Sequence, residues 1–245
     1  MTEEEKSLSR PERKRQQRAQ VFIEAAQRII AAEGFEGLTM SRLAAELDTV
    51  VSAVYRYFPS KGALIAAIQE EGIERMSASL TTIVGSGDRH FAAGGLDERG
   101  VAVARLVLFG RWLCATTETY PEELRLFQLI MSQRESALDP EGGLRMFPIA
   151  MALGGHAVAA LDAAEACGAI EAGSSIDRAV IWASGLSGVL ETDDLERYAP
   201  GLFGKTRLAR QANVDLIAGW GASRDAITRG SELVDGLAAI GPLAP

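Results

Sequence analysis

The feature that most constrains this chain is a series of short helical segments near its N-terminus, separated by tight breaks. The first segment has apolar residues at positions i, i+4, i+7 and i+8, namely Phe22, Ala26, Ile29 and Ile30. This spacing places them on one face of an amphipathic helix. Gly34 is expected to end the helix, because glycine adopts the left-handed conformation that follows a last helical turn.

Two shorter helices are predicted to follow. Thr39 reads as the N-cap of a helix over 40–47, and Asp48 as the residue of a tight break, since Asp tolerates the left-handed region. A third helix is predicted over 50–58 and is stopped by Pro59. Two short helices joined by a tight turn, behind a longer bracing helix, form a helix-turn-helix layout.

The third helix should have one core-facing side. Val50, Val54 and Phe58 repeat at i, i+4 and i+8 and are expected to face the core. Ser60 is expected to cap a fourth, longer helix.

The charge of the chain is unevenly distributed. The 245 residues hold 25 Lys+Arg and 33 Asp+Glu, a net charge of −8 that taken whole argues against a nucleic-acid-binding protein. Residues 1–61 hold 10 Lys+Arg and 9 Asp+Glu, which leaves 15 and 24 for 62–245. Five cations cluster within nine positions: Arg10, Arg13, Lys14, Arg15 and Arg18. Such a run is either a solvated helix face or a phosphate-binding arm.

The remainder of the chain reads as helices separated by Gly- and Pro-marked breaks. No strand-like alternation is found, so the predicted fold class is all-α. Breaks are expected at 85–96 and 138–145. The helices are expected at 61–84, 97–119, 121–137, 146–168, 175–192, 203–221 and 223–240.

Several functional classes are disfavoured by composition. Two separated cysteines and two histidines indicate neither a disulfide framework nor a metal site, and no cofactor motif is found. No Ser/His/Asp arrangement or phosphate loop supports an enzyme. No secretory signal or membrane span is found, so a soluble cytoplasmic protein is expected.

The N-terminal residues resemble the DNA-binding domain of TetR-family transcriptional regulators. The resemblance covers roughly residues 15–65 and rests on the segments AAQRIIAAEGF (25–35), LTMSRLA (38–44) and VYRYFPSKGAL (54–64). It implies an N-terminal three-helix helix-turn-helix domain with a basic arm at 1–60. A larger helical-bundle domain for effector binding and dimerisation would occupy 61–245.

The resemblance also implies roles for individual residues. Arg13, Lys14 and Arg18 would form the basic arm on the DNA. Tyr55 and Tyr57 match positions that commonly touch the DNA backbone, although packing between helices is the alternative. Lys61 and the backbone amide of Thr39 suit phosphate contacts, with simple capping an equal alternative for Thr39. Base contacts would fall to Val51, Ser52, Ala53 and Arg56, where Arg56 favours phosphate, with Ser41 a secondary candidate.

One departure from the family pattern lies in the turn. The family usually has Gly-Val-Ser where this chain has Asp48-Thr49-Val50. The usual serine N-cap of the recognition helix is therefore a valine, so Thr49 caps one position earlier or the first turn is looser. Either outcome changes the direction in which the side chains of Val51 and Ser52 point.

Two further interpretations concern the larger domain. Apolar helices there either form a plain core or wall an effector cavity. The candidate ligand-binding residues are Arg105, Arg111, Trp112, Cys114, Phe127, Met131, His156 and Trp182. Small residues at 175–192 and 203–221 suit either internal packing or the dimer interface that the resemblance implies.

The function that these features favour is a dimeric DNA-binding repressor released from its operator by a small, mostly apolar effector. A helical adaptor that has lost DNA binding and a helical enzyme acting on an apolar substrate are the alternatives.

Overall fold

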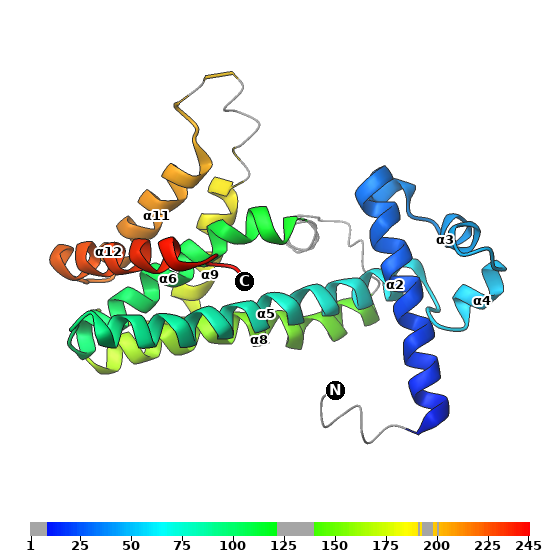
Figure 1. Cartoon of the computed structure of the whole chain (residues 1–245), viewed down its shortest axis with the longest axis horizontal. Helices are drawn as coiled ribbons and strands as arrows, with labels where there is room; N and C mark the ends of the chain where they lie inside the picture. The colour runs from blue at the N-terminus through cyan, green and yellow to red at the C-terminus, as the bar shows by residue number, and fades with distance from the viewer. Residues whose placement is uncertain (1–8, 122–139, 191, 193–197, 200) are drawn as a thin grey trace. The chain divides into compact units, whose positions relative to one another are not determined.

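The computed structural model describes residues 9–121, 140–190, 192, 198, 199 and 201–245. Within these ranges the secondary structure is helical and no strand occurs, as the all-α prediction required. The helices are α2 (Arg10–Gly37), α3 (Met40–Glu46), α4 (Val51–Tyr55), α5 (Lys61–Ala93), α6 (Glu98–Thr119), α8 (Pro140–Ala166), α9 (Ser175–Leu190), α11 (Lys205–Gly219) and α12 (Arg224–Ile240) (Figure 1). The helix predicted over 121–137 lies outside the described residues from 122 onward.

The chain divides into two compact units. The first unit comprises Met1–Glu71 and Leu129–Phe147, and the second comprises Gly72–Gln128 and Pro148–Pro245. Helices α5 and α8 therefore contribute residues to both units. The division into domains at 1–60 and 61–245 remains a prediction.

The first unit has a small apolar core of its own. Helix α2 packs on α3, and α3 packs on α4. Five side chains are fully buried where these helices and the start of α5 meet, namely Phe22, Leu38, Leu43, Val54 and Leu64. Removing these side chains from water supplies the main driving force that holds three short helices together.

The second unit is organised around α6. This helix packs against α12, α11 and α9, and its Trp112 indole donates a hydrogen bond to Ser79 Oγ of α5 at 3.1 Å. Contact with α12 is close, since a Cβ placed on Gly230 would lie 3.1 Å from Ala104 Cα. Helix α6 is long and apolar enough to cross a membrane, but 78% of its most apolar window is buried inside the protein. It serves as the core helix of the unit.

The predicted break at 85–96 is wrong for its greater part, because α5 continues to Ala93. The glycines that suggested a loop serve packing instead. A Cβ on Gly87 would lie 2.6 Å from Leu108 Cδ2 of α6, so the missing side chain lets the two helices approach closely. The chain leaves α5 only at Gly95, where φ is 72°.

The predicted break at 138–145 is also wrong from residue 140 onward, where α8 begins. Pro140 is the first residue of this helix. Proline suits that position because its missing N–H would have no intrahelical partner and its φ is already helical. A proline taken as a break signal therefore marks a helix start.

Candidate nucleic-acid interface

The connector between α2 and α3 is fixed by local conformational signals. Gly34 has φ 72° and ψ −178°, which interrupts the helix where the sequence predicted. Leu38 then inserts into the core, and Thr39 caps α3 by accepting a 3.0 Å hydrogen bond from the Arg42 amide to its Oγ1. The prediction of Thr39 as N-cap is confirmed.

The turn between α3 and α4 is a tight one. Asp48 has φ 48°, so it adopts the left-handed conformation that was expected of it. The Thr49 amide donates to the Ala44 carbonyl at 2.9 Å and closes the turn. Val50 occupies the N-cap position of α4 without a side-chain capping bond, so Thr49 does not replace the usual serine cap.

The prediction of which residues at 50–58 face the core needs one correction. Val54 and Phe58 are buried as expected, but Val50 is 67% exposed. A residue at an N-cap position has extended backbone, with φ −88° and ψ 145° at Val50. Its side chain therefore leaves the helical repeat and points to solvent.

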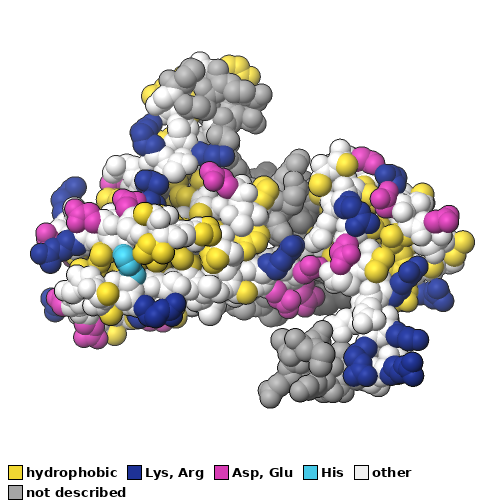
Figure 2. All heavy atoms as spheres, in the orientation of Figure 1, with side chains coloured by type: hydrophobic (Ala, Val, Ile, Leu, Met, Phe, Trp, Pro, Cys, Tyr) yellow, Lys and Arg dark blue, Asp and Glu magenta, His cyan; other side chains and the backbone are white. Residues whose placement is uncertain are grey.

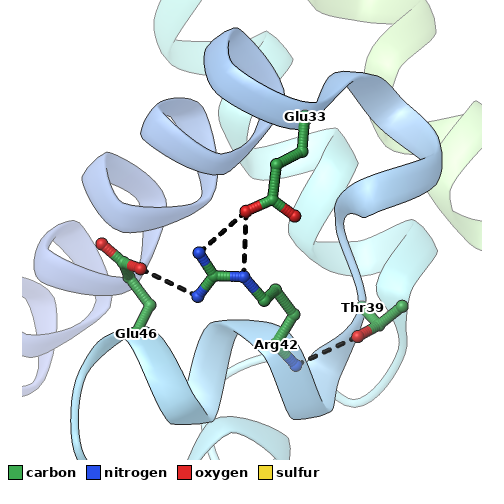
Figure 3. A network of polar contacts seen from close by, with 4 residues as sticks. All are labelled: Glu33, Thr39, Arg42 and Glu46. Atoms are coloured by element: carbon green, nitrogen blue, oxygen red, sulfur yellow. Dashed lines mark hydrogen bonds and ion pairs between the residues drawn. The ribbon is translucent and has the colours of Figure 1, made fainter.

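A polar network around Arg42 ties α2 to α3 (Figure 3). Oε1 of Glu33, in α2, accepts from Arg42 Nε at 3.0 Å and Nη2 at 2.8 Å, and Oε2 of Glu46 accepts from Nη1 at 2.8 Å. These bonds, first those to Glu33, raise the pKa of Arg42 above its ordinary value. Figure 3 shows the guanidinium between the two carboxylates, while the backbone amide of Arg42 donates its hydrogen bond to Thr39 Oγ1. Arg42 therefore holds the helix that carries Thr39 and Ser41.

Sequence reasoning missed this network. The Arg42–Glu46 pair has the i, i+4 spacing of neighbouring residues on a helix face, and this signal was present. Glu33 is nine residues away across a break, and only the folded connector brings it to Arg42.

The predicted DNA-contacting residues divide into an exposed set and a packed set. Thr39, Ser41, Ser52, Tyr55 and Arg56 are exposed, and Val51 and Lys61 are half-buried. Ala53 is only 7% exposed, because it faces the core beside Val54, so its expected base contact does not agree with the structure. Tyr57 is half-buried, and its ring centroid lies 5.3 Å from that of Phe22, which agrees with the packing alternative.

The basic arm is part of α2. Arg13, Lys14 and Arg18 are exposed on the first turns of this helix, and Figure 2 shows Lys and Arg side chains gathered there. The guanidinium of Arg18 lies 5.5 Å from the centroid of the Phe22 ring. Short exposed helices with polar tips, next to a cationic surface, form the kind of interface that meets a DNA groove and its phosphates.

Comparison with known proteins agrees with this geometry. Residues 22–68 match the family model of bacterial regulatory proteins, tetR family. These residues run from the first buried side chain of α2 through the helix-turn-helix to the start of α5. This segment carries a DNA-binding domain of the TetR type.

Individual relatives resemble this chain to different extents. A segment of 43 residues is 56% identical to HTH-type transcriptional repressor DrrR1 of Streptomyces coeruleorubidus, and it spans 18% of this chain and 16% of that repressor. A TetR transcription regulator from Haloarcula marismortui shares the fold with a TM-score of 0.61 at 16% identity, over 84% of this chain and 98% of that one. The structure of RolR in complex with resorcinol gives a TM-score of 0.55 at 16% identity, over 91% and 95%.

The second unit places the candidate ligand-binding residues among different partners. Arg105 pairs with Asp88 of α5 at 2.6 Å, and Arg111 pairs with Asp235 of α12. His156 Nε2 lies 3.2 Å from Ser77 Oγ. Each of these side chains thus joins two helices of the unit. Phe127 and Met131 lie outside the described residues.

Two of the candidates belong to one aromatic cluster. The Phe109 ring lies between Trp112, at a centroid distance of 5.7 Å, and Trp182, at 4.5 Å. Trp220 packs edge-on against Trp182 at 5.5 Å. Sequence reasoning did not select Phe109 or Trp220, because their convergence requires the packing of α6, α9 and the end of α11.

Cys114 is a buried residue of α6, the helix that also carries Phe109 and Trp112. Burial raises the pKa of its thiol to about 11, although the charges of Arg111 and Arg210 act in the opposite direction. The group is therefore an uncharged thiol at neutral pH and a poor nucleophile.

Proposed function

We propose that this protein is a transcriptional repressor that binds an operator through α3 and α4 and is released from it by a small, mostly apolar effector. The observation that carries the proposal is the exposed tip of the helix-turn-helix, where Ser52, Tyr55 and Arg56 of α4 and its C-cap face solvent. Beside them α3 exposes Ser41 and its cap Thr39. Binding, rather than catalysis, is the proposed activity, and a protein acting on chromosomal DNA works in the cytoplasm.

We assign base contacts to Ser52 and Val51 and phosphate contacts to Tyr55, Arg56 and Lys61. Hydroxyl groups read base edges at short range, whereas guanidinium, ammonium and phenol groups suit phosphate oxygens. Ser41 is the secondary base contact, and Thr39 both caps α3 and presents its amide. Ala53 and Tyr57 serve the packing of the domain instead.

The protein would bind DNA as a homodimer through α9 and α11. Helix α9 exposes Ile176, Val180 and Ile181 by 59%, 57% and 56%. These large apolar side chains form a contiguous solvent-facing patch, which in a water-soluble domain marks an interaction surface. A Cβ on Gly185 or Gly188 would meet no atom within 4 Å, so the same helix offers room for a close partner helix. Two copies place two recognition helices on one palindromic operator.

Val180→Arg is expected to convert the dimer into a monomer at micromolar concentrations, because it places an uncompensated cation in the centre of the patch. Sedimentation velocity measures the mass of the particle. The matched control is Ile240→Arg, since Ile240 is 75% exposed in the last turn of α12, where a cation is tolerated. A Val180→Arg variant that stays dimeric while remaining folded would contradict the assignment of α9.

The proposed effector site is in the second unit, near the cluster formed by Phe109, Trp112 and Trp182. Aromatic walls with few polar groups suit a small, mostly apolar ligand. The structural relative RolR, which has resorcinol bound, supports an aromatic molecule of that size. The effector would release DNA by binding more tightly to a conformation in which the recognition helices no longer fit the operator.

An electrophoretic shift with the DNA upstream of the protein's own gene tests the proposal. We expect retardation at low salt, weaker retardation at about 200 mM salt because phosphate contacts release counterions, and competition by specific but not random DNA. Absence of retardation of every fragment at low salt would refute the repressor function and leave an adaptor role.

A further inference from the structure

The turn before α4 leaves an aliphatic side chain in water. Val50 is 67% exposed, whereas Leu38, Leu43 and Val54 of the same helix-turn-helix are fully buried. Among the described side chains of residues 9–71, it is the most exposed of the large apolar ones. A domain with a small core gains stability from each apolar side chain that it buries, so a valine left outside forgoes that stabilisation.

Valine is also a poor residue for the position that it occupies. Val50 stands at the N-cap of α4 and makes no side-chain capping bond. Serine, threonine, asparagine and aspartate are preferred at this position, because their side-chain oxygen accepts a hydrogen bond from the first turn of the helix. Folding therefore gains from Val50 neither core burial nor a cap. Residues that break local rules in this way are expected at functional sites.

The backbone holds the Val50 side chain in a fixed direction. The Ala53 amide donates to the Val50 carbonyl at 2.8 Å. On the other side of the residue, the Thr49 amide donates to the Ala44 carbonyl at 2.9 Å. A β-branched side chain has few rotamers, so Val50 would lose little conformational entropy when a partner covers it.

The place of Val50 in the chain decides the kind of partner. The recognition helix of a helix-turn-helix brings its N-terminal residues to the edges of bases in the major groove. Val50 directly precedes Val51 and Ser52, the two residues to which the proposed function assigns base contacts. The methyl groups of valine neither donate nor accept hydrogen bonds, so the feature of a base edge that suits them is the C5-methyl group of thymine.

We infer that Val50 is a specificity-determining residue, which packs against a thymine methyl group in each half of the operator. This inference rests on the proposed DNA binding and extends it to one feature of one base pair. Burial of one methyl group changes a binding constant about fourfold, so the two half-sites bound by a dimer should together give about tenfold or more.

Replacing thymine with uracil in the DNA tests the inference on the full-length protein. Uracil keeps the base pair with adenine and removes only the C5-methyl group. The DNA upstream of the protein's own gene is made in both forms, and anisotropy titrations give its affinity for wild type and for Val50→Ser. We expect wild type to bind the thymine form about tenfold more tightly, and Val50→Ser to bind the two forms within about twofold. Serine is favoured at an N-cap, so the variant should keep the wild-type melting temperature or exceed it.

The matched control is Val21→Ser, the same substitution at a valine of α2 that is 36% exposed. It should keep the wild-type ratio of affinities for the two forms. A random fragment made in both forms measures the effect of uracil on the DNA itself, and each ratio is taken relative to it.

Three outcomes would overturn the inference. Equal affinity of wild type for the two forms would do so while leaving the repressor proposal intact. A ratio that persists in Val50→Ser but is lost in Val51→Ala would assign the methyl contact to Val51 instead. If wild type binds neither form at low salt, the repressor proposal itself fails, and the inference fails with it.

Discussion

Replacing Asn213 with alanine is expected to lower the free energy of unfolding by about 2–4 kcal/mol. Asn213 is 1% exposed. Its Oδ1 accepts from the Trp182 indole at 2.7 Å, and its Nδ2 donates to the Val107 carbonyl at 3.3 Å. Alanine would leave the indole N–H buried without an acceptor and create a cavity beside it.

Helix α6 lies close to the Asn213 side chain, so a substitution on α6 should also lower the stability of this site. A Cβ on Gly110 would lie 2.3 Å from Asn213 Cγ, so Gly110→Ala should displace the amide and cost a comparable amount. Gly155→Ala is the control, because a Cβ there meets nothing within 4 Å and alanine favours an exposed helix. Urea unfolding gives the midpoint and slope for each variant. A loss below about 0.5 kcal/mol for Asn213→Ala would show that the amide does not bridge α6 and α9 in solution.

The starts and ends of the N-terminal helices were predictable from the sequence because the signals that set them are local. Gly34 and Asp48 take positive φ values, and Thr39 and Ser60 cap the helices that follow them. Each of these depends on one residue type and on neighbours within four positions. The exposed side of α4 followed from the same local register, with two exceptions. The cap conformation interrupts the helical repeat at Val50, and Ala53, expected at the DNA, faces the core.

Features that depend on tertiary contact were not predictable. Gly87 has the same composition signal as a loop glycine, but it lies inside α5 because Leu108 of α6 needs the space. Asn213 has no sequence signal at all, since its partners Val107 and Trp182 are far away in the chain. The candidate effector residues were chosen for polar chemistry within apolar helices, and most of that chemistry joins helices to one another. Polar groups in a core must find partners there, and the sequence alone does not name the partner.

Replacing Ser52 with glutamate is expected to weaken binding to operator and unrelated DNA by about 100-fold or more. Ser52 is exposed at the second position of α4, where the proposed interface meets the groove. A carboxylate there faces phosphates across a short distance, and opposed like charges cost several kcal/mol in an interface. The fold should not suffer, since an acidic residue near a helix N-terminus is locally favourable.

The matched control for Ser52→Glu is Thr228→Glu, which adds the same charge at an exposed position of α12, a helix that is assigned neither to the DNA contact nor to the dimer contact. Both substitutions are at exposed helix positions, so both should keep the wild-type melting temperature. Only Ser52→Glu should lose DNA in an anisotropy titration, and its loss should persist at a salt concentration where wild type still binds. Equal affinities for the two variants would place α4 away from the DNA and remove the basis for base recognition by Val51 and Ser52. A loss confined to Ser52→Glu instead assigns the groove contact to α4, because both variants carry the same added charge on an exposed helical residue.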